Sequence, residues 1–466
     1  MNENFNIYRY RIMNQDGEAS NGITRYVKIT DSVICEIRIT DIKDIITDYI
    51  NGLEFVFDGI YRDSLMEVIQ QKASILFSDT QLEFLDYCDV DILKDTADTA
   101  YYPFKNCIVS VDRNGIHTSN YNQLNGKLIW KDKIINSNYE ENYDYKDFSF
   151  NRFVRKINDD KEERINYFSS CLGYILHGYK DELNPVCVIL GEQVSDSQEG
   201  GGAGKGLITT AIAKIVNQVI IDGKDFKSEK TFSLQRVAID TQLVVIQDTD
   251  ERFNFESLFS KLTDGLTVEK KNKDEFFIPY CDSPKFMITT NYTIPNTSSA
   301  ARRRQRLIEF NNFFNDAYTP FDYLGEYLFY GWNKDNWNKF YTIMFDFVAY
   351  YFQHGLLKMK ESDSSTKKRI SNNYTQEFYD FFKELSTDYQ YQFDTAYHAF
   401  LSENGFNEKS YSNIRFSKGL DDGCQAFGYK RLKKKNESTK KALFILSTGA
   451  EIKESVCEEE ETALPF

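Results

Sequence analysis

Paired cysteines and clustered histidines are both missing from this chain of 466 residues. The eight cysteines are scattered, no C-x-x-C pair occurs, and several of them lie inside apolar runs. This pattern argues against a disulfide framework and is typical of reduced thiols in a cytosolic protein. The four histidines are too far apart in the sequence to predict a zinc site.

Long hydrophobic runs and a positive net charge are missing as well. No apolar run approaches the roughly 20 residues that a membrane-spanning helix needs, and the opening Met1-Asn2-Glu3-Asn4 does not predict a signal peptide. We therefore expect a cytoplasmic protein with no membrane partner. The net charge of −15 and the pI near 5.0 argue against general coating of DNA, so any DNA-binding surface must be local.

A strand, a glycine-rich loop and a helix are predicted in succession between residues 186 and 219. In such a loop, glycines turn backbone N–H groups toward phosphate oxygens, the helix N-terminus adds its positive dipole end, and a lysine reaches the β- and γ-phosphates. A flexible linker is the alternative, but linkers seldom separate a buried strand from an amphipathic helix. The predicted ATP-binding residues are Gly202, Ala203, Gly204, Lys205, Gly206 and Leu207.

Polar side chains follow two further apolar strands of this stretch. Asp248 comes just after the run 243–246, where a carboxylate can hold Mg²⁺ or polarise the attacking water. Asn291 follows the run 286–290, where its amide can orient that water. Arginines then precede a last strand that ends at Phe310. Any one of these residues could be an ordinary strand-end side chain, but their ordered succession favours a nucleotide-hydrolysing site.

This order of motifs resembles the motor domain of superfamily 3 helicases, in the phage and plasmid branch related to poxvirus primase-helicases. The resemblance implies an α/β fold of the AAA+ type over residues 185–357 and a homo-hexameric ring that hydrolyses ATP with Mg²⁺ while translocating on single-stranded DNA. On the family's R-R-x-x-x-x-x-F spacing, Arg303 and Arg304 match the arginines that reach the neighbouring subunit's nucleotide.

Three positions depart from the phosphate-loop and family patterns. In G-x-x-x-x-G-K-[ST], the first glycine is replaced by Glu199 and the final Ser/Thr by Gly206. In relatives, the strand that carries the catalytic acid usually ends in two adjacent acidic residues. In this chain, Gln247 occupies the first of these two positions. Thr209 or Thr210 lies close enough in the sequence to supply a hydroxyl. These changes weaken the expected Mg²⁺ site and bear on turnover more than on nucleotide binding.

Residues 261–274 predict a β-hairpin with a lysine-rich tip. In the family this hairpin projects into the channel of the ring, so Lys270, Lys271 and Lys273 are candidate contacts to DNA phosphates. A solvated surface turn is the alternative, since lysines are common at exposed sheet edges.

The remaining chain predicts several accessory parts. Residues 1–146 predict an N-terminal collar or partner-docking region, 147–184 a helical segment, and 358–373 a linker. Residues 374–447 predict three helices and a basic hairpin, as in a winged helix. Its DNA-binding candidates are Arg415, Lys433, Lys434 and Lys435. The alternative is a solvated basic loop on an accessory domain.

The last residues, 448–466, form an acidic stretch that closes in Leu464, Pro465 and Phe466. This ending resembles the C-terminal tip of bacterial single-stranded-DNA-binding proteins, which docks into pockets of replication and repair proteins. We hypothesise that host replication proteins bind these three residues. A solubilising tail is the alternative.

These sequence features are compatible with two functions. The first is an ATP-dependent replicative DNA helicase, a hydrolase of a bacteriophage, plasmid or other mobile element. The second is a nucleotide-binding replication initiator or scaffold with weak or no hydrolysis, which binds duplex origin DNA through residues 374–447. Asn291 and the arginine pair favour the motor, and the altered Mg²⁺ positions favour the initiator.

Overall fold

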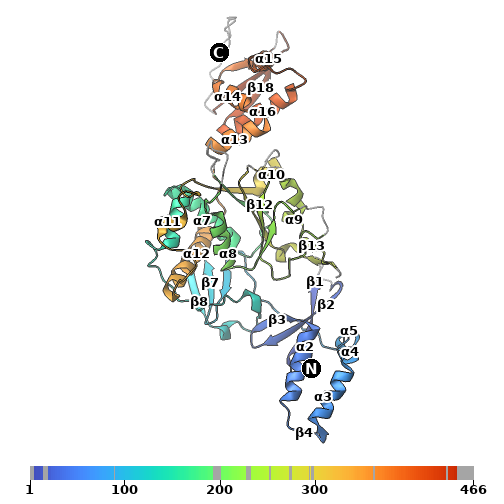
Figure 1. Ribbon diagram of the computed structural model, residues 1–466. Coiled ribbons are helices and arrows are strands. Elements are labelled where there is room, and N and C mark those ends of the chain that lie inside the picture. Colours follow the sequence, from blue (N-terminus) through green and yellow to red (C-terminus); the bar gives the residue numbers. More distant parts are fainter. Residues whose placement is uncertain are drawn as a thin grey trace. The chain divides into compact units, whose positions relative to one another are not determined.

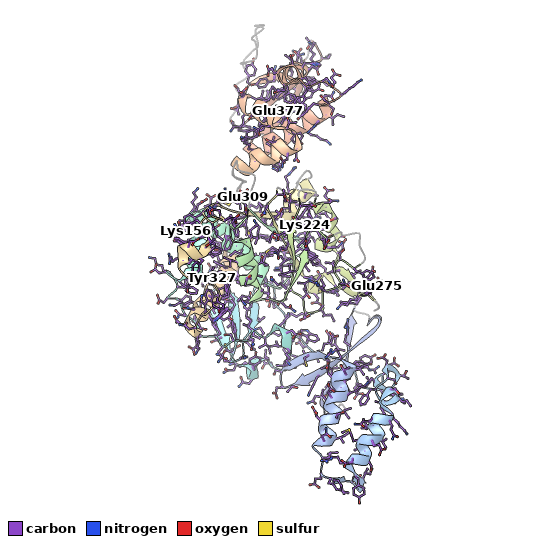
Figure 2. The ribbon with its side chains drawn as sticks, viewed as in Figure 1. Lys156, Lys224, Glu275, Glu309, Tyr327 and Glu377 are labelled. Carbon is purple, nitrogen blue, oxygen red and sulfur yellow. The ribbon has the colours of Figure 1, made fainter. Side chains whose placement is uncertain are left out.

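A computed structural model gives the structure of the chain as two compact units, Met1–Met359 and Lys360–Phe466, each of which is described by itself (Figure 1). The structure describes residues 5–13, 19–88, 90–192, 201–226, 232–250, 253–271, 275–292, 294, 299–359, 363–436 and 439–448. Figure 2 gives the same view with side chains drawn as sticks. No helix in these ranges is long and apolar enough to cross a membrane.

The centre of the first unit is a five-stranded parallel sheet in the order β11-β12-β15-β10-β16. The inner strands are continuous apolar runs, because a parallel sheet is covered on both faces. The strands are β10 (Cys187–Glu192), β11 (Gln218–Asp222), β12 (Leu243–Thr249), β15 (Lys285–Thr290) and β16 (Gln305–Phe310). All five run the same way, so their carboxyl ends meet at one edge. The predicted α/β class is confirmed.

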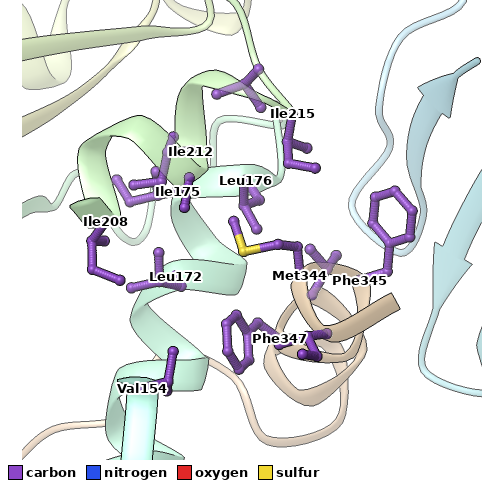
Figure 3. Close-up of a cluster of buried hydrophobic side chains, with 14 of the residues drawn as sticks. Val154, Leu172, Ile175, Leu176, Ile208, Ile212, Ile215, Met344, Phe345 and Phe347 are labelled. Atoms are coloured by element: carbon purple, nitrogen blue, oxygen red, sulfur yellow. The ribbon is translucent and has the colours of Figure 1, made fainter. Parts of the chain in front are cut away.

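Helices α6 (Ser149–Ile157), α7 (Glu162–Leu176), α8 (Lys205–Ala213) and α12 (Lys334–His354) share one large apolar core with this sheet. Figure 3 shows side chains of α7, α8 and α12 meeting in that core. At Gly173 of α7, a Cβ would lie only 2.2 Å from the backbone oxygen of Phe347, so the close approach of α7 and α12 requires glycine. The helical segment predicted at 147–184 contains α6 and α7.

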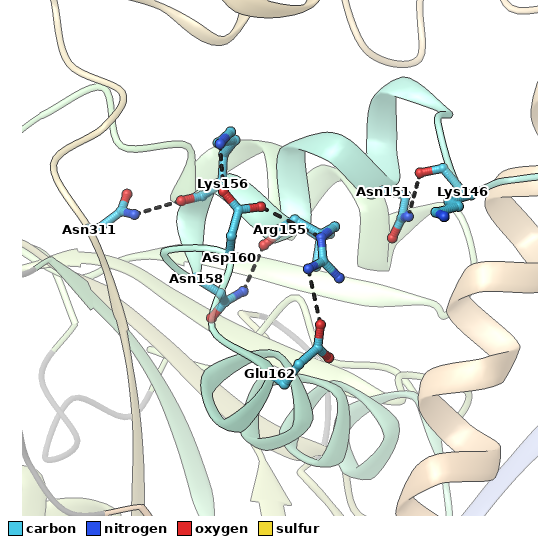
Figure 4. Close-up of polar contacts among 9 residues, drawn as sticks. Lys146, Asn151, Arg155, Lys156, Asn158, Asp160, Glu162 and Asn311 are labelled. Carbon is cyan, nitrogen blue, oxygen red and sulfur yellow. Dashed lines mark hydrogen bonds and ion pairs between the residues drawn. The ribbon is translucent and has the colours of Figure 1, made fainter.

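Polar contacts fix the turn between α6 and α7 and tie it to the end of β16 (Figure 4). Arg155 pairs with Glu162 at 3.0 Å, and Asn158 Nδ2 donates to the Val154 carbonyl at 2.9 Å. Asn311, the residue after β16, donates from Nδ2 to the Lys156 carbonyl at 2.6 Å. These bonds hold α6 next to the carboxyl edge of the sheet.

A second core covers other residues of the sheet. Its elements include η3 (Phe255–Leu258), α9 (Phe259–Thr263), β13 (Leu266–Val268), β14 (Phe276–Ile278) and α10 (Ser299–Arg304). Strands β13 and β14 pair antiparallel, so the predicted hairpin is present. Two further short helices of this unit are η4 (Tyr280–Asp282) and α11 (Pro320–Leu324).

The N-terminal part of the first unit is built from two small sheets and a helical hairpin. The sheets are β1-β2-β3-β9 and β6-β7-β8. Their strands are β1 (Ile7–Met13), β2 (Ala19–Thr30), β3 (Val33–Ile37), β6 (Ala100–Pro103), β7 (Ile108–Asp112), β8 (Gly115–Ser119) and β9 (Ile129–Trp130). The other elements are α2 (Ile39–Asn51), β4 (Val56–Phe57), β5 (Ile60–Tyr61), α3 (Arg62–Gln71), α4 (Ala73–Leu76), α5 (Asp79–Leu82), η1 (Tyr121–Gln123) and η2 (Lys131–Lys133).

The second unit has its own aromatic core and a three-stranded antiparallel sheet in the order β17-β19-β18. Its elements are α13 (Asp363–Asn373), α14 (Gln376–Glu384), β17 (Gln390–Gln392), α15 (Phe393–Glu403), α16 (Asn413–Phe427), β18 (Lys430–Lys435) and β19 (Ala442–Ser447). The polar composition of residues 358–373 predicts a linker, and this prediction is wrong for residues 363–373. They form α13 instead, and Ile370 is fully buried in the core of this unit.

Candidate functional site

The glycine-rich loop enters α8 through two residues that only glycine can occupy comfortably. Gly202 and Gly204 have φ values of 79° and 98°, in the left-handed region that side chains disfavour. A Cβ on Gly204 would lie 2.6 Å from Cζ of Phe153, and one on Gly202 would lie 3.1 Å from the Asn315 backbone. Residues 202–204 therefore form a tight turn against α6, and the predicted residues 205–207 lie in the first turn of α8, which begins at Lys205. Gly200 lies outside the described residues.

Lys205 is held between the ends of two neighbouring strands. Its side chain is 9% exposed, and its ammonium forms an ion pair with Glu192, the last residue of β10. The same Nζ donates to Oδ1 of Asn291, just after β15, at 2.6 Å. The structure thus brings together two predicted residues, Lys205 and Asn291, which are 86 positions apart.

Glu192 is the site residue that the sequence reasoning missed. Its carboxylate is 7% exposed and supplies the counter-charge that a buried ammonium requires. The signal was its position as the last residue of the strand before the loop, on the same sheet edge as Asn291. A phosphate arriving at Lys205 would have to replace this carboxylate.

Asp248 lies one strand further along the same edge. The pairing of β12 with β15 is irregular between Ile246 and Thr249, and Asp248 has a φ of 55°. Its N–H donates to Thr289 Oγ1 at 3.0 Å, while its side chain is exposed and accepts from Gln247 Nε2 at 3.3 Å. The carboxylate is therefore available to a ligand at this edge.

The donor set fits Mg²⁺ only in its usual nucleotide-bound form, with one or two carboxylates and the phosphates. Among the described residues, no group of three or more His, Cys, Asp or Glu side chains could hold a metal ion. Gly206 offers no hydroxyl. Thr209 and Thr210 donate theirs to the carbonyls of Lys205 and Gly206, at 3.2 and 2.9 Å, within α8.

The two candidate arginines lie at the end of α10, and their environments differ. Arg304 has its guanidinium 4.7 Å from the ring centre of Phe259 and donates to the Ala300 carbonyl at 3.3 Å. Arg303 is exposed, and its side chain makes no hydrogen bond or ion pair with the described part of the chain. Arg303 is the better placed of the two to reach another molecule.

Both arginines lie at the edge of the sheet opposite Lys205. Strand β16 starts at Gln305, which pairs with Cys187 at the start of β10, and ends at Phe310 beside Glu192. A strand of six residues separates its ends by about 17 Å at roughly 3.3 Å per residue. The arginines therefore lie too far from Lys205 of the same chain to share one site with it.

The hairpin lysines are only partly free to meet DNA. Lys270 is half-buried, with Nζ 5.3 Å from the ring centre of Phe276, and Lys271 is exposed. Arg25 of β2 lies 5.5 Å from the same ring, which places the hairpin against the N-terminal sheet. Lys273 lies outside the described residues.

In the second unit, Arg415 is turned toward its own fold. It donates from Nη2 to the Asn373 carbonyl at 3.1 Å, and its guanidinium lies 4.7 Å from the Tyr411 ring centre. Arg415 therefore supplies a hydrogen-bond donor to the last carbonyl group of α13. Lys433, Lys434 and Lys435 are exposed on β18. The tail residues Leu464, Pro465 and Phe466 lie outside the described residues.

Comparison with known proteins gives only distant structural neighbours. No family model and no curated protein matches the sequence. The apo C-terminal region of NrS-1 aligns over 94% of this chain and 96% of its own, at 12% identity and a TM-score of 0.40. A crystal structure of JCV helicase with a bound acetamide compound aligns over 35% of this chain and 51% of its own, at 15% identity and a TM-score of 0.22. The assignment of function therefore depends on the geometry of the site.

Proposed function

We propose that this chain is an ATP-dependent DNA helicase of the superfamily 3 type, with an AAA+-like motor that acts as a hexameric ring in the replication of a phage, plasmid or other mobile element. The observation that carries the proposal is the contact between Lys205, at the end of a glycine-rich loop, and Asn291, at the end of a neighbouring parallel strand. A phosphate-binding lysine and a water-orienting amide then share one site.

Each residue of the proposed site has its own role in hydrolysis. Backbone N–H groups of the loop 202–204 cradle the phosphates, and Lys205 leaves Glu192 to contact the β- and γ-phosphates. Mg²⁺, when bound with ATP, neutralises phosphate charge. Asn291 orients the attacking water, and Asp248 at the same edge polarises it or holds the metal.

A neighbouring subunit completes the site in this proposal. Arg303 is exposed at the opposite edge of the sheet and is too far away to reach the nucleotide of its own subunit. In a head-to-tail ring, one subunit's arginine edge faces the next subunit's nucleotide edge. Arg303 would then stabilise the charge that develops on the neighbour's γ-phosphate.

Two parts of the chain are proposed to hold DNA. The β13–β14 hairpin presents Lys270 and Lys271 to single-stranded DNA in the ring channel. The second unit, in which α14 to α16 precede a basic antiparallel hairpin, is proposed to be a winged helix that binds duplex DNA. Host replication proteins binding at 464–466 remain a hypothesis.

A second candidate is a nucleotide-binding initiator or scaffold that hydrolyses ATP weakly or not at all. The observation that favours it is the absence of a hydroxyl at Gly206, the position of the Ser/Thr that holds Mg²⁺ in the phosphate-loop pattern. Such a protein would bind ATP and origin DNA without coupling them to movement.

The experiment that separates the two candidates is ATP hydrolysis by the purified chain with and without single-stranded DNA. The proposal predicts hydrolysis that DNA stimulates and that Lys205→Ala abolishes. Lys214→Ala removes an exposed lysine from the far end of the same helix and should keep the activity. Nucleotide binding without turnover would contradict the motor and favour the initiator.

A further inference from the structure

A basic groove lies in the second unit between α16 and the β18–β19 hairpin. Its volume is 410 Å³. Its lining includes four cations, Arg431 and Lys433 to Lys435, together with the hydroxyl-bearing Ser417 and the ring of Phe393. In a chain with a net charge of −15, such a concentration of positive charge is a local exception.

The groove continues the inner face of the small sheet beyond the apolar core. In an antiparallel pair, directly opposite residues share a face. Arg431 is opposite Leu446 and Lys433 is opposite Phe444, and both apolar partners are fully buried. Strand β18 thus carries cations on the face where its neighbour carries core residues. The Arg431 side chain is buried there while that of Lys433 is exposed, and a buried cation is costly unless an anion accompanies it.

Several contacts hold the guanidinium of Arg431 in place, and they leave its Nε–H group without an acceptor in the described part of the chain. Its side chain is 5% exposed, and Nη1 donates to the Ser417 carbonyl at 2.8 Å and to Ser417 Oγ at 3.0 Å. The guanidinium lies 5.6 and 5.3 Å from the ring centres of Phe393 and Phe444. The buried Nε has no hydrogen-bond partner among the described residues.

One carboxylate, Asp421 of α16, bridges two of the cations. Its Oδ1 lies 3.2 Å from Arg431 Nη1 and its Oδ2 lies 3.1 Å from Lys433 Nζ. The Asp421 side chain is 45% exposed, and ion pairs of such exposure are weak. A phosphodiester also offers two oxygens and could replace this carboxylate on the same two cations.

We propose that this groove is a phosphodiester-binding subsite for duplex DNA and that Asp421 occupies the phosphate position until DNA replaces it. The inference deepens the proposed function and rests on its DNA-binding part. Proteins that hold single strands use open aromatic rings on which bases stack. Among the described residues, four cations and a single aromatic residue line this groove, so it suits a charged backbone rather than a stack of bases.

The test is the affinity of the full chain for a short fluorescent DNA duplex, measured by anisotropy without nucleotide at several salt concentrations. Asp421→Asn should tighten binding by about three- to tenfold, because it frees two cations for a phosphate. Glu403→Gln is the matched control, since Glu403 is exposed on α15 and its neutralisation changes the net charge equally. It should change the affinity much less.

Lys433→Ala, at an exposed position that should tolerate truncation, should weaken binding and lower the slope of log affinity against log salt by about one. Adding Asp421→Asn to Lys433→Ala should recover less than the full gain. Equal effects of Asp421→Asn and Glu403→Gln, an unchanged salt slope for Lys433→Ala, or a larger effect on a single strand than on the duplex would each overturn the proposal. The assay contains no nucleotide, so a chain that fails to hydrolyse ATP can still pass it.

Discussion

At the scale of single residues, the proposed nucleotide site is defined by contacts that sequence patterns predict only in part. The loop glycines, Lys205 and Asn291 could be predicted because each has a required chemistry at a recognisable strand end. Glu192 could not, since its role depends on which strand borders β15 in the sheet. Arg415 was predicted as a DNA contact from its position on a helix, but its guanidinium is used to satisfy the end of α13.

The two glycines that flank Lys205 should respond differently to the same substitution. Gly204→Ala places a Cβ in the ring of Phe153 at a φ of 98° and should weaken nucleotide binding about tenfold, which corresponds to about 1.4 kcal/mol. At Gly206 a Cβ meets nothing within 4 Å, so Gly206→Ala should bind nucleotide nearly as the unchanged protein does. Titration of a fluorescent ATP analogue measures both. Equal losses at the two positions would contradict this account of the loop.

His177, at the end of α7, should make the protein sensitive to acid. Burial, reinforced by the nearby charge of Lys285, lowers its pKa to about 3 from an ordinary value of 6.5. Below pH 6.5, His177 binds a proton in the unfolded chain but not in the folded chain. The free energy of unfolding therefore falls as the pH drops from 6.5 toward 3. The loss from this residue should approach about 1.4 kcal/mol per pH unit.

The measurement for His177 is urea unfolding between pH 4.5 and 7.5, with His177→Gln as the test variant. Glutamine keeps a donor for the Thr96 carbonyl, which His177 Nε2 contacts at 2.7 Å, and it does not titrate. The variant should lose less stability on acidification than the unchanged protein does. His398→Gln, at an exposed position, should leave the pH profile as it was. Identical profiles for all three proteins would contradict the assignment.

At the scale of elements, strong apolar periodicity made most of the core strands and helices predictable. The strands β10, β12 and β15 are buried runs, and the hairpin β13–β14 follows from alternation around a polar turn. Helix α13 escaped prediction because it carries few apolar side chains, and only the fold reveals that Ile370 packs on α14 and α16. The order of the strands also had to come from the structure.

Helix α13 should be essential to the second unit alone. Ile370→Ala removes a fully buried side chain and should destabilise this unit by about 3 kcal/mol. Because the two units have separate cores, duplex DNA binding should fail at a lower temperature while ATP-analogue binding by the first unit persists. Lys367→Ala, at an exposed position of the same helix, is the control. Loss of nucleotide binding in parallel with DNA binding would contradict independent units.

At the scale of the whole molecule, the proposed activity requires more than one subunit. Lys205 and Arg303 lie at opposite edges of one sheet, and a single chain cannot bring them together. The arginines precede their strand whereas Lys205 follows its own, and the parallel pairing of β16 with β10 places the two at opposite ends of the sheet. With a net charge of −15, the proposed binding of DNA would be confined to a few basic surfaces.

Mixing two inactive variants should restore hydrolysis if neighbouring subunits share a site. Lys205→Ala retains its arginine, and Arg303→Ala retains its lysine. In an equal mixture that exchanges subunits at random, about a quarter of the interfaces combine both intact residues. The mixture should therefore recover up to roughly that share of the original ATPase rate, with each variant alone as the control. No recovery in rings shown to contain both variants would contradict a shared site.

The proposed coupling of ATP hydrolysis to movement along DNA can be measured as strand separation. The measurement is the release of a fluorescent strand from a forked duplex by the purified chain with ATP and Mg²⁺. The account predicts strand release that requires ATP and is lost in Lys205→Ala. Intact duplex despite tight binding of both ATP and DNA would contradict the motor and assign the chain to the initiators or scaffolds.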